Sequence, residues 1–270
     1  MQRILKFFYT LINKLYFLRA SASLKKNSKT ISQILNIWKE EKKNNYEEIN
    51  EYEKKVGFSI QSDFLHELGL LTQVTDKKSK ISYSHGRLLY SCLSKYCSTN
   101  NITNINILEV GTARGFSSLC MAKALEDNSI SGKIITMDIL PLHKKIYWNC
   151  KSDELGKINR NTLLKDYDYL IKKYIIFLQF DTLSDYKRIS LNRVNFAFID
   201  GCHDGNHLKS EFEILKNSQL KGDQIIFDDY SFEKFPTLYN EINKICNIYN
   251  YSKEVICSDK GRCYLIATKI

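Results

Sequence analysis

Residues 105–117 read INILEVGTARGFS, and this stretch decides the fold of the chain. Its first six positions are mostly apolar, which predicts a buried strand that ends at Gly111. Gly115 then precedes a helical pattern over Phe116–Leu125. A strand, a glycine turn and a helix in this order let backbone N–H groups approach a ligand closely, because glycine has no Cβ to block the approach.

Outward from this stretch, short β-branched runs alternate with helical patterns. The predicted strands are Ile105–Val110, Lys133–Asp138, Ile175–Phe180, Val194–Asp200, Gln224–Asp228, Lys253–Cys257 and Cys263–Thr268. The predicted helices around them are Leu88–Tyr96, Phe116–Leu125, Thr162–Lys173, His207–Lys216 and Phe235–Ile248. This alternation predicts an α/β fold: a doubly wound, mostly parallel seven-stranded sheet with helices on both faces and an antiparallel C-terminal strand.

The first 80 residues contain no clear strand-like run and no glycine-rich turn. We therefore expect an N-terminal helical extension over residues 1–80 and the α/β domain over residues 81–270. Apolar residues three or four positions apart predict three helices in the extension. These are Ile31–Trp38, Tyr46–Val56 and Phe64–Leu71.

Before these helices, Ile4–Leu18 is apolar with polar residues at helical spacing, which predicts an amphipathic helix with one basic face. The run is too short and too often interrupted by Lys and Asn to span a bilayer. We expect it to pack on the body of the protein or on a partner, and an anionic membrane surface is the alternative. A cytoplasmic location is expected, with peripheral membrane contact left open.

The net charge of +10 first suggests nucleic acid as a partner. However, the lysines are scattered among Glu, Asn and Ile, as in Lys39–Lys43, and no aromatic residues interleave with them in a basic ladder. The charge therefore indicates a solvated surface and argues against nucleic acid as a partner. The sequence leaves a homo-oligomer open.

The eight cysteines contain no C-x-x-C pair and are too widely spaced for a small secreted disulfide framework. We expect reduced thiols that mostly pack as small apolar side chains. Cys257 and Cys263 flank the predicted turn at 259–261, so this pair could lie face to face.

The glycine turn does not have the dinucleotide-binding pattern G-x-G-x-x-G, which would require glycine in place of both Ala113 and Phe116. Asp138 stands at the end of the next predicted strand. A carboxylate at this place can accept hydrogen bonds from both hydroxyls of a ribose.

Two later strands end in acidic residues, Asp200 on one and Asp228 with Asp229 on the other. Three carboxylates at one edge of the sheet would repel one another, and a divalent cation with oxygen ligands is the simplest compensation. Mg²⁺ fits best, with Mn²⁺ and Ca²⁺ as alternatives, because neither sulfur nor several histidines are implied as ligands. The alternative is that one Asp caps a helix and another holds an ammonium group of the cofactor.

His203 follows Asp200 by one short turn. An imidazole at this position could remove a proton from a substrate hydroxyl held on the cation, since an alcohol is a poor nucleophile at neutral pH. A buried structural histidine is the competing interpretation.

The pattern E-x-G-x-x-x-G-x-S over Glu109–Ser117 resembles the first motif of class I S-adenosylmethionine-dependent methyltransferases. Two further stretches carry the resemblance, FIDGCH at 198–203 and GDQIIFDDY at 222–230. With them, residues 83–270 resemble the metal-dependent O-methyltransferases related to macrocin O-methyltransferase. The resemblance to catechol O-methyltransferase is more distant. The resemblance implies S-adenosylmethionine as cofactor and a hydroxyl of a glycan or glycosylated small molecule as acceptor.

The resemblance also implies the roles of individual residues. The cofactor would be bound by Glu109, Gly111, Thr112, Gly115, Phe116, Ser117, Ser118, Asp138, Asp181 and Asp200. The metal, with Mg²⁺ favoured by the ligand types, would be bound by Asp200, Asp228 and Asp229, and catalysis would fall to His203 with Asp200.

Departures from the family pattern concern the rest of the site. Gly205 stands where the family commonly has an aromatic residue, and Phe180–Thr182 stands where a glycine turn usually contacts adenine. Leu140–Asn161 is longer than a crossover requires, so we expect it to form a lid or a substrate wall.

Two other functions compete with this interpretation. An RNA or protein methyltransferase would suit the basic charge, but the N-P-P-Y motif of enzymes that methylate exocyclic amines is absent, since the chain has only Pro141 and Pro236. A non-catalytic binding protein that retains the fold is the second alternative, because a fold does not prove an activity.

Overall fold

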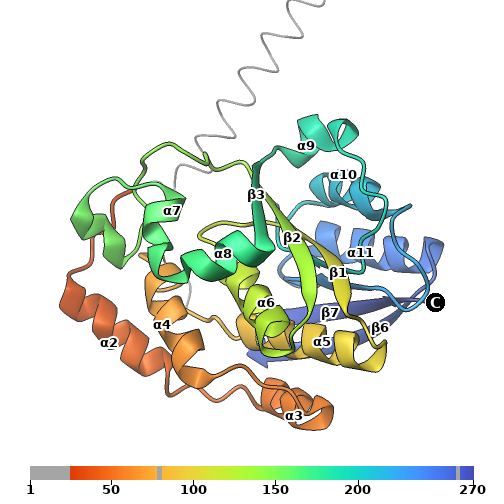
Figure 1. Cartoon of the computed structure of the whole chain (residues 1–270), viewed down its shortest axis with the longest axis horizontal. Helices are drawn as coiled ribbons and strands as arrows, with labels where there is room; N and C mark the ends of the chain where they lie inside the picture. Colours follow the sequence, from red (N-terminus) through yellow and green to blue (C-terminus); the bar gives the residue numbers. More distant parts are fainter. Residues whose placement is uncertain (1–24, 78–80, 260–261) are drawn as a thin grey trace, which may run out of the picture.

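The computed structural model describes residues 25–77, 81–259 and 262–270. Its strands are β1 (Asn104–Val110), β2 (Ser131–Asp138), β3 (Ile175–Gln179), β4 (Phe196–Ile199), β5 (Gln224–Phe227), β6 (Tyr251–Asp259) and β7 (Arg262–Lys269). They form one sheet in the order β3-β2-β1-β4-β5-β7-β6 (Figure 1). The pairs among β1 to β5 are parallel, and β7 runs antiparallel to both β5 and β6. The predicted α/β fold with its antiparallel C-terminal strand is confirmed.

Helices precede and connect these strands. The α-helices are α2 (Ile31–Glu41), α3 (Glu47–Val56), α4 (Ser62–Thr72), α5 (His85–Thr99), α6 (Phe116–Asp127), α7 (Arg160–Leu163), α8 (Asp168–Tyr174), α9 (Thr182–Asp185), α10 (Gly205–Leu215) and α11 (Pro236–Ile248). Short 3₁₀ helices in the described residues are η2 (Lys151–Leu155), η3 (Lys165–Tyr167) and η4 (Tyr186–Arg188).

One predicted helix is broken in the structure. Residues expected as the single helix Thr162–Lys173 form α7, η3 and α8, because Leu164 leaves the helical conformation (φ −102°, ψ 20°). The break places Leu163, Leu164 and Tyr167 in the core together. Tertiary packing has therefore overridden the helical propensity of this segment.

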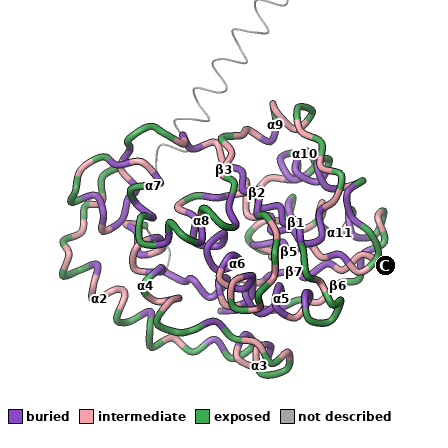
Figure 2. The backbone as a smooth tube through the Cα atoms, viewed as in Figure 1, coloured by how far each residue is buried: buried purple, intermediate pink, exposed green. Residues whose placement is uncertain are grey.

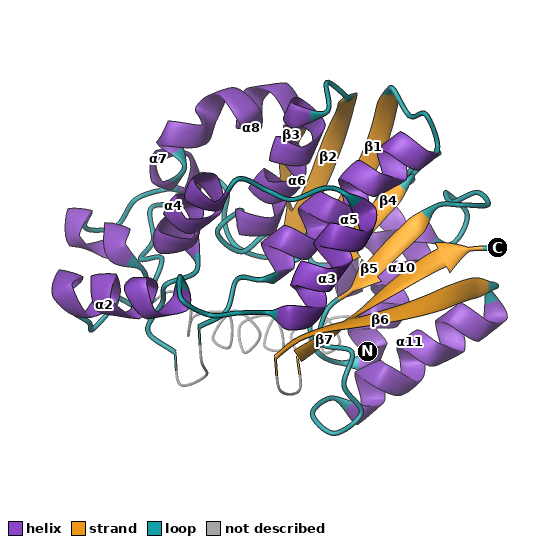
Figure 3. Ribbon diagram, turned by 90° about the horizontal axis from the view of Figure 1, so that it is seen from below, coloured by secondary structure: helices purple, strands orange, loops and turns teal. Residues whose placement is uncertain are grey.

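The sheet is covered on both faces, and each face has its own apolar core (Figure 3). Helices α5, α6 and α8 cover one face, while α10 and α11 cover the other. Successive residues of a strand point to opposite faces, so Ile107 of β1 joins the first core and Leu108 joins the second. This two-sided burial explains why the central strands are apolar throughout and do not alternate with polar residues.

The described helices of the N-terminal extension pack into the first core (Figure 2). Ile49 of α3 and Leu68 of α4 are fully buried there, in the same cluster as Leu89 and Leu125 of the α/β domain. Helix α3 packs against α5 and β6, and α4 packs against α6. The extension and the α/β domain therefore share a core, and the boundary at residue 80 stays a prediction.

The predicted amphipathic helix at Ile4–Leu18 lies outside the described residues. Within the described part of the chain, no helix has both the length and the apolar character needed to cross a membrane.

The cysteine expectations can be compared with the structure residue by residue. Cys257 of β6 and Cys263 of β7 are opposite each other in the ladder and form a disulfide. The other six cysteines are free thiols, and five of them are buried, as expected for small apolar side chains.

The shared core gives a test of whether the extension folds with the rest of the chain. We expect Leu68→Ala to lower the free energy of unfolding by about 2–5 kcal/mol, because it leaves a cavity in the core that α4 shares with the α/β domain. Denaturant titration followed by circular dichroism measures this change. Leu155→Ala is the control, since Leu155 is 77% exposed and its loss should cost no more than about 0.5 kcal/mol. Equal stability of the two variants would show that α4 contributes nothing to the cooperative core.

Candidate active site

The glycine turn after β1 lies directly against the end of β4. Gly111 has φ +100°, and a Cβ built on it would lie 2.0 Å from the backbone oxygen of Asp200. Its N–H donates to the carbonyl of Met137 on β2 at 2.9 Å. Only glycine allows this conformation and this approach, so the turn brings the carboxyl ends of β1, β2 and β4 together.

Glu109 lies beneath this turn and is fully buried. Its carboxylate accepts hydrogen bonds from the hydroxyls of Ser117, Ser118 and Thr136. Thr136 is in turn 2.5 Å from the hydroxyl of Thr112. Burial raises the pKa of Glu109, although the three hydroxyl donors oppose the shift. The network joins β1, β2 and the first turn of α6, and it supports the glycine turn from behind.

Asp138 ends β2 and faces the turn from the side. Its carboxylate accepts hydrogen bonds from the backbone N–H of Ala113 at 2.6 Å and of Leu140 at 2.8 Å. A carboxylate offers about four acceptor positions, so two remain for a ligand's hydroxyl groups. Asp138 therefore fixes the glycine turn and keeps the capacity to accept from a ribose.

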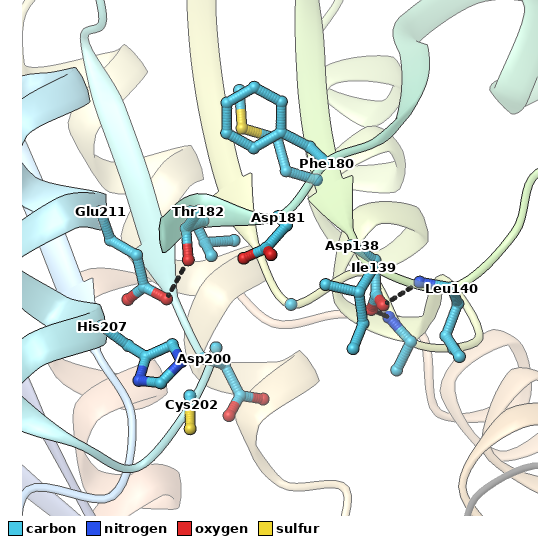
Figure 4. A pocket seen from close by; sticks show the side chains of 15 residues that line it. Asp138, Ile139, Leu140, Phe180, Asp181, Thr182, Asp200, Cys202, His207 and Glu211 are labelled. Atoms are coloured by element: carbon cyan, nitrogen blue, oxygen red, sulfur yellow. Dashed lines mark hydrogen bonds between the residues drawn. The ribbon is translucent and has the colours of Figure 1, made fainter. Parts of the chain in front are cut away.

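A cavity of about 330 Å³ opens at this edge of the sheet (Figure 4). Figure 4 shows Asp138 on one side of it, His207 and Glu211 on the other, and Asp181 between them. The lining residues come from the ends of β1 to β4 and from α9 and α10: Val110, Gly111, Ala113, Met137, Asp138, Ile139, Leu140, Phe180, Asp181, Thr182, Asp200, Gly201, Cys202, His207 and Glu211. Pockets at the carboxyl ends of parallel strands are where open α/β sheets bind ligands.

The residues predicted to bind the cofactor fall into two groups. Those that line the cavity are Gly111, Asp138, Asp181 and Asp200. Those that are not among its lining residues are Glu109, Thr112, Gly115, Phe116, Ser117 and Ser118, all of them buried. The second group is buried around the glycine turn and does not line the cavity. Within it, Gly115 (φ +89°) is the N-cap residue of α6.

The structure adds cavity residues that the sequence pattern did not single out. Thr182 of α9 and Glu211 of α10 approach each other, with Oγ1 3.4 Å from Oε1. His207 of α10 is 2.8 Å from Asp204 through Nδ1 and also hydrogen-bonds Cys202. A signal was present in the sequence, because residues 207 and 211 share one face of a helix at spacing i, i+4.

The environment of α10 changes the protonation of both of its cavity residues. The hydrogen bond with Cys202 and that with Asp204 raise the pKa of His207 to about 9, against the effect of burial. Burial raises the pKa of Glu211 to about 7. The wall of the cavity therefore carries a cationic imidazole and a carboxyl group that changes charge near neutral pH.

The acidic residues at the ends of β4 and β5 lie together beside the cavity. Asp229 is 3.1 Å from Nδ1 of His203, whose ring packs edge-on against Phe235. Asp228 forms an ion pair of 2.9 Å with Arg262 at the start of β7. The residues whose potential ligand atoms lie within 4.8 Å of one another are Asp200, His203 and Asp229.

The group that has the spacing of metal ligands differs in one member from the predicted metal set, and metal binding by either set stays a prediction. Asp228 directs its carboxylate to Arg262, and His203 completes the group that has the spacing of metal ligands. A divalent cation would find two carboxylates and one imidazole there, in place of three carboxylates.

Charge and burial act differently on the acidic residues. Burial, and then the charge of Asp228, raise the pKa of Asp200 well above its usual value. Burial would also raise the pKa of Asp228, but the charge of Arg262 outweighs it and holds that pKa below its usual value. The neighbouring His85 is buried, which lowers its pKa to about 3 and leaves it neutral.

The long segment after β2 is built into the protein body. Trp148 is buried, and its Nε1 donates to the carbonyl of Ile158 at 2.9 Å. Arg160 lies over the rings of Trp148 and Phe177. Of this segment, Leu140 lines the cavity, so any role of the remainder as a lid or substrate wall stays a prediction.

Comparison with known proteins agrees with this geometry. Residues 108–230 match a family model described as a methyltransferase domain. The structure is similar to the O-methyltransferase NovP (14% identity, TM-score 0.53), with 72% of this chain and 84% of that one covered. It is also similar to the O-methyltransferase TomG from Streptomyces achromogenes, involved in tomaymycin synthesis and solved in complex with S-adenosylmethionine (14% identity, TM-score 0.53, 78% and 92% covered). Comparison with curated protein sequences gave no match.

At 14% identity, the two structures establish a shared fold. The family match contains the glycine turn, Asp138 and the acidic ends of β4 and β5. Together these findings support a methyltransferase domain over residues 108–230, in a fold that the chain shares with these two O-methyltransferases.

The close approach of Gly111 to Asp200 can be tested by adding one methyl group. We expect Gly111→Ala to weaken binding of S-adenosylhomocysteine roughly tenfold or more, because the turn must move away from β4. Gly57→Ala is the matched control, since Gly57 also has a positive φ (+80°) but a Cβ added there would meet no atom within 4 Å. It should cost about 1–2 kcal/mol of stability and leave the affinity unchanged. Isothermal titration calorimetry measures both affinities, and equal values would contradict the role of the close contact.

The carboxyl of Glu211 predicts a dependence of stability on pH. Its pKa is raised from 4.5 to about 7, so the unfolded chain loses this proton at lower pH than the folded protein does. The protonated carboxyl of Glu211 therefore contributes fully to the free energy of unfolding below about pH 4.5. This contribution falls by about 1.4 kcal/mol for each pH unit as the pH rises from there to 7. We expect Glu211→Gln to remove this part of the pH dependence. Urea titrations of both proteins between these pH values measure it, and parallel pH profiles would show that Glu211 ionises normally.

Proposed function

We propose that the chain transfers a methyl group from S-adenosylmethionine to a hydroxyl oxygen of a small molecule, and that a glycan or glycosylated compound is the acceptor. The observation that carries the proposal is the cavity beside Gly111 and Asp138, which is continuous at Asp200 with the group that contains His203. A donor site and a proton-accepting site are thus adjacent on one edge of the sheet.

Each part of the donor has a matching feature in the cavity. The ribose hydroxyls would be accepted by Asp138, and the adenine end would lie toward Asp181 and Thr182. The methionine end would lie along Gly111, where the missing Cβ leaves backbone exposed to the ligand. Asp200 both lines the cavity and belongs to the group that contains His203.

Methyl transfer from a sulfonium requires in-line placement and removal of one proton. The bond between the acceptor oxygen and the methyl carbon forms as the carbon–sulfur bond breaks, and S-adenosylhomocysteine leaves. His203 would take the hydroxyl proton, because Asp229 holds its Nδ1 and leaves Nε2 for the acceptor. Phe235 packs against the same ring and limits its orientation.

The divalent cation expected from the sequence would be held by Asp200, His203 and Asp229. It would supply Lewis acidity to the acceptor hydroxyl. A cation bound through His203 would occupy the imidazole that otherwise accepts the proton, so the two arrangements predict different effects of chelation.

The donor site is the first part of the proposal to test. We expect the wild-type chain to bind S-adenosylmethionine and S-adenosylhomocysteine, and Asp138→Asn to weaken both roughly tenfold or more, because an amide accepts fewer hydrogen bonds from ribose. Transfer of a labelled methyl group to a panel of glycosylated acceptors then tests the reaction. His203→Ala should abolish transfer while leaving binding of S-adenosylhomocysteine intact. Binding without transfer to any hydroxyl acceptor would favour a non-catalytic protein, and transfer to RNA would favour the nucleic-acid alternative.

A further inference from the structure

Arg262 joins the acidic group from a strand that the site motifs do not include. It is the first residue of β7, which runs antiparallel to β5, the strand that ends just before Asp228. The N–H of Tyr230 donates to the carbonyl of Cys263 at 2.9 Å, so the loop after β5 is tied to the start of β7. The disulfide between Cys263 and Cys257 anchors the same end of β7 to β6.

The guanidinium group forms a direct ion pair with the most buried of the acidic residues. Arg262 lies 2.9 Å from Asp228, whose side chain is 2% exposed, while that of Arg262 is 22% exposed. The Nε of Arg262 is buried and has no hydrogen-bond partner among the described residues. Removing one member of such a buried pair is strongly destabilising, because the other charge is left uncompensated.

The positive charge of Arg262 meets Asp228 in direct contact and holds the pKa of this carboxyl below its usual value. Burial and the charge of Asp228 raise the pKa of Asp200 and that of Asp229, and Arg262 only opposes this rise. A guanidinium stays charged at every pH at which proteins fold, so its compensation is permanent. A divalent cation is the usual compensation for clustered carboxylates, and for Asp228 the fixed side-chain cation takes that place.

We propose that Arg262 is the resident counter-cation of Asp228, and that it takes this carboxylate out of the acidic group so that a divalent cation is dispensable at this site. The consequence for catalysis rests on the proposed function: methyl transfer would proceed in the presence of a chelator, with His203 free to accept the proton. In this arrangement Arg262 is a positioning residue, because it holds Asp228 away from the acceptor side and does not itself contact the reacting atoms.

The test measures metal binding and needs no methyl acceptor, so its outcome is separate from that of the proposed function. Mn²⁺ is titrated into chelator-treated full-length protein, and the electron paramagnetic resonance signal of free Mn²⁺ reports binding. We expect the wild type and Arg262→Lys to show no saturable binding, because both keep a cation at this position. Arg262→Met should show saturable Mn²⁺ binding, with a dissociation constant roughly tenfold or more below the highest Mn²⁺ concentration at which the wild type shows none, since Asp228 is released and the group loses its positive charge.

The double variant Asp228→Asn with Arg262→Met is the matched control, and it should lose the gain in Mn²⁺ affinity. The double variant also serves if Arg262→Met fails to fold. If the double variant then folds, the failure of the single variant came from the uncompensated charge of Asp228, which confirms the role of the ion pair. Two results would overturn the proposal. One is that the wild type binds Mn²⁺ saturably and His203→Ala abolishes this binding. The other is that Arg262→Met folds and binds Mn²⁺ no better than the wild type. Retained binding of S-adenosylhomocysteine shows that a variant is folded at the donor site.

Discussion

The absence of a side chain at Gly111 is the constraint on which the rest of the site depends. A Cβ there would lie 2.0 Å from the backbone oxygen of Asp200, so the ends of β1 and β4 can approach only if this residue is glycine. The approach places the cavity and the acidic residues at one edge of the sheet. Glu109 and its three hydroxyl donors stabilise the turn from behind, and Asp138 holds it from the side. The chemistry proposed for the site follows from this arrangement of backbone.

Much of this could be read from the sequence because the signals are local. The run 105–110, its terminal glycine and the following helix predict β1, the turn and α6 without any knowledge of distant residues. The acidic residues after two later strands were expected at one edge, since parallel strands present their carboxyl ends together. Asp138 and Asp200 do line the same cavity. Sequence order and strand direction were sufficient for these placements.

The remaining features depend on pairings that no local pattern encodes. Asp228 is 34 residues from Arg262 along the chain, and their ion pair follows from the antiparallel pairing of β5 with β7. Glu109 was expected at the cofactor, but its carboxylate is enclosed by hydroxyls from α6 and β2, whose positions are set by tertiary packing. His207 and Glu211 were available as an i, i+4 pair, yet the sequence alone does not show that this helix face borders the cavity.

A crystal structure with S-adenosylhomocysteine tests the central claim most directly. We predict that the ribose hydroxyls lie on the carboxylate of Asp138 and the homocysteine portion between Gly111 and Asp200. A ligand bound elsewhere on the molecule, or one bound in this cavity with its ribose away from Asp138, would contradict the assignment of the cavity as the donor site.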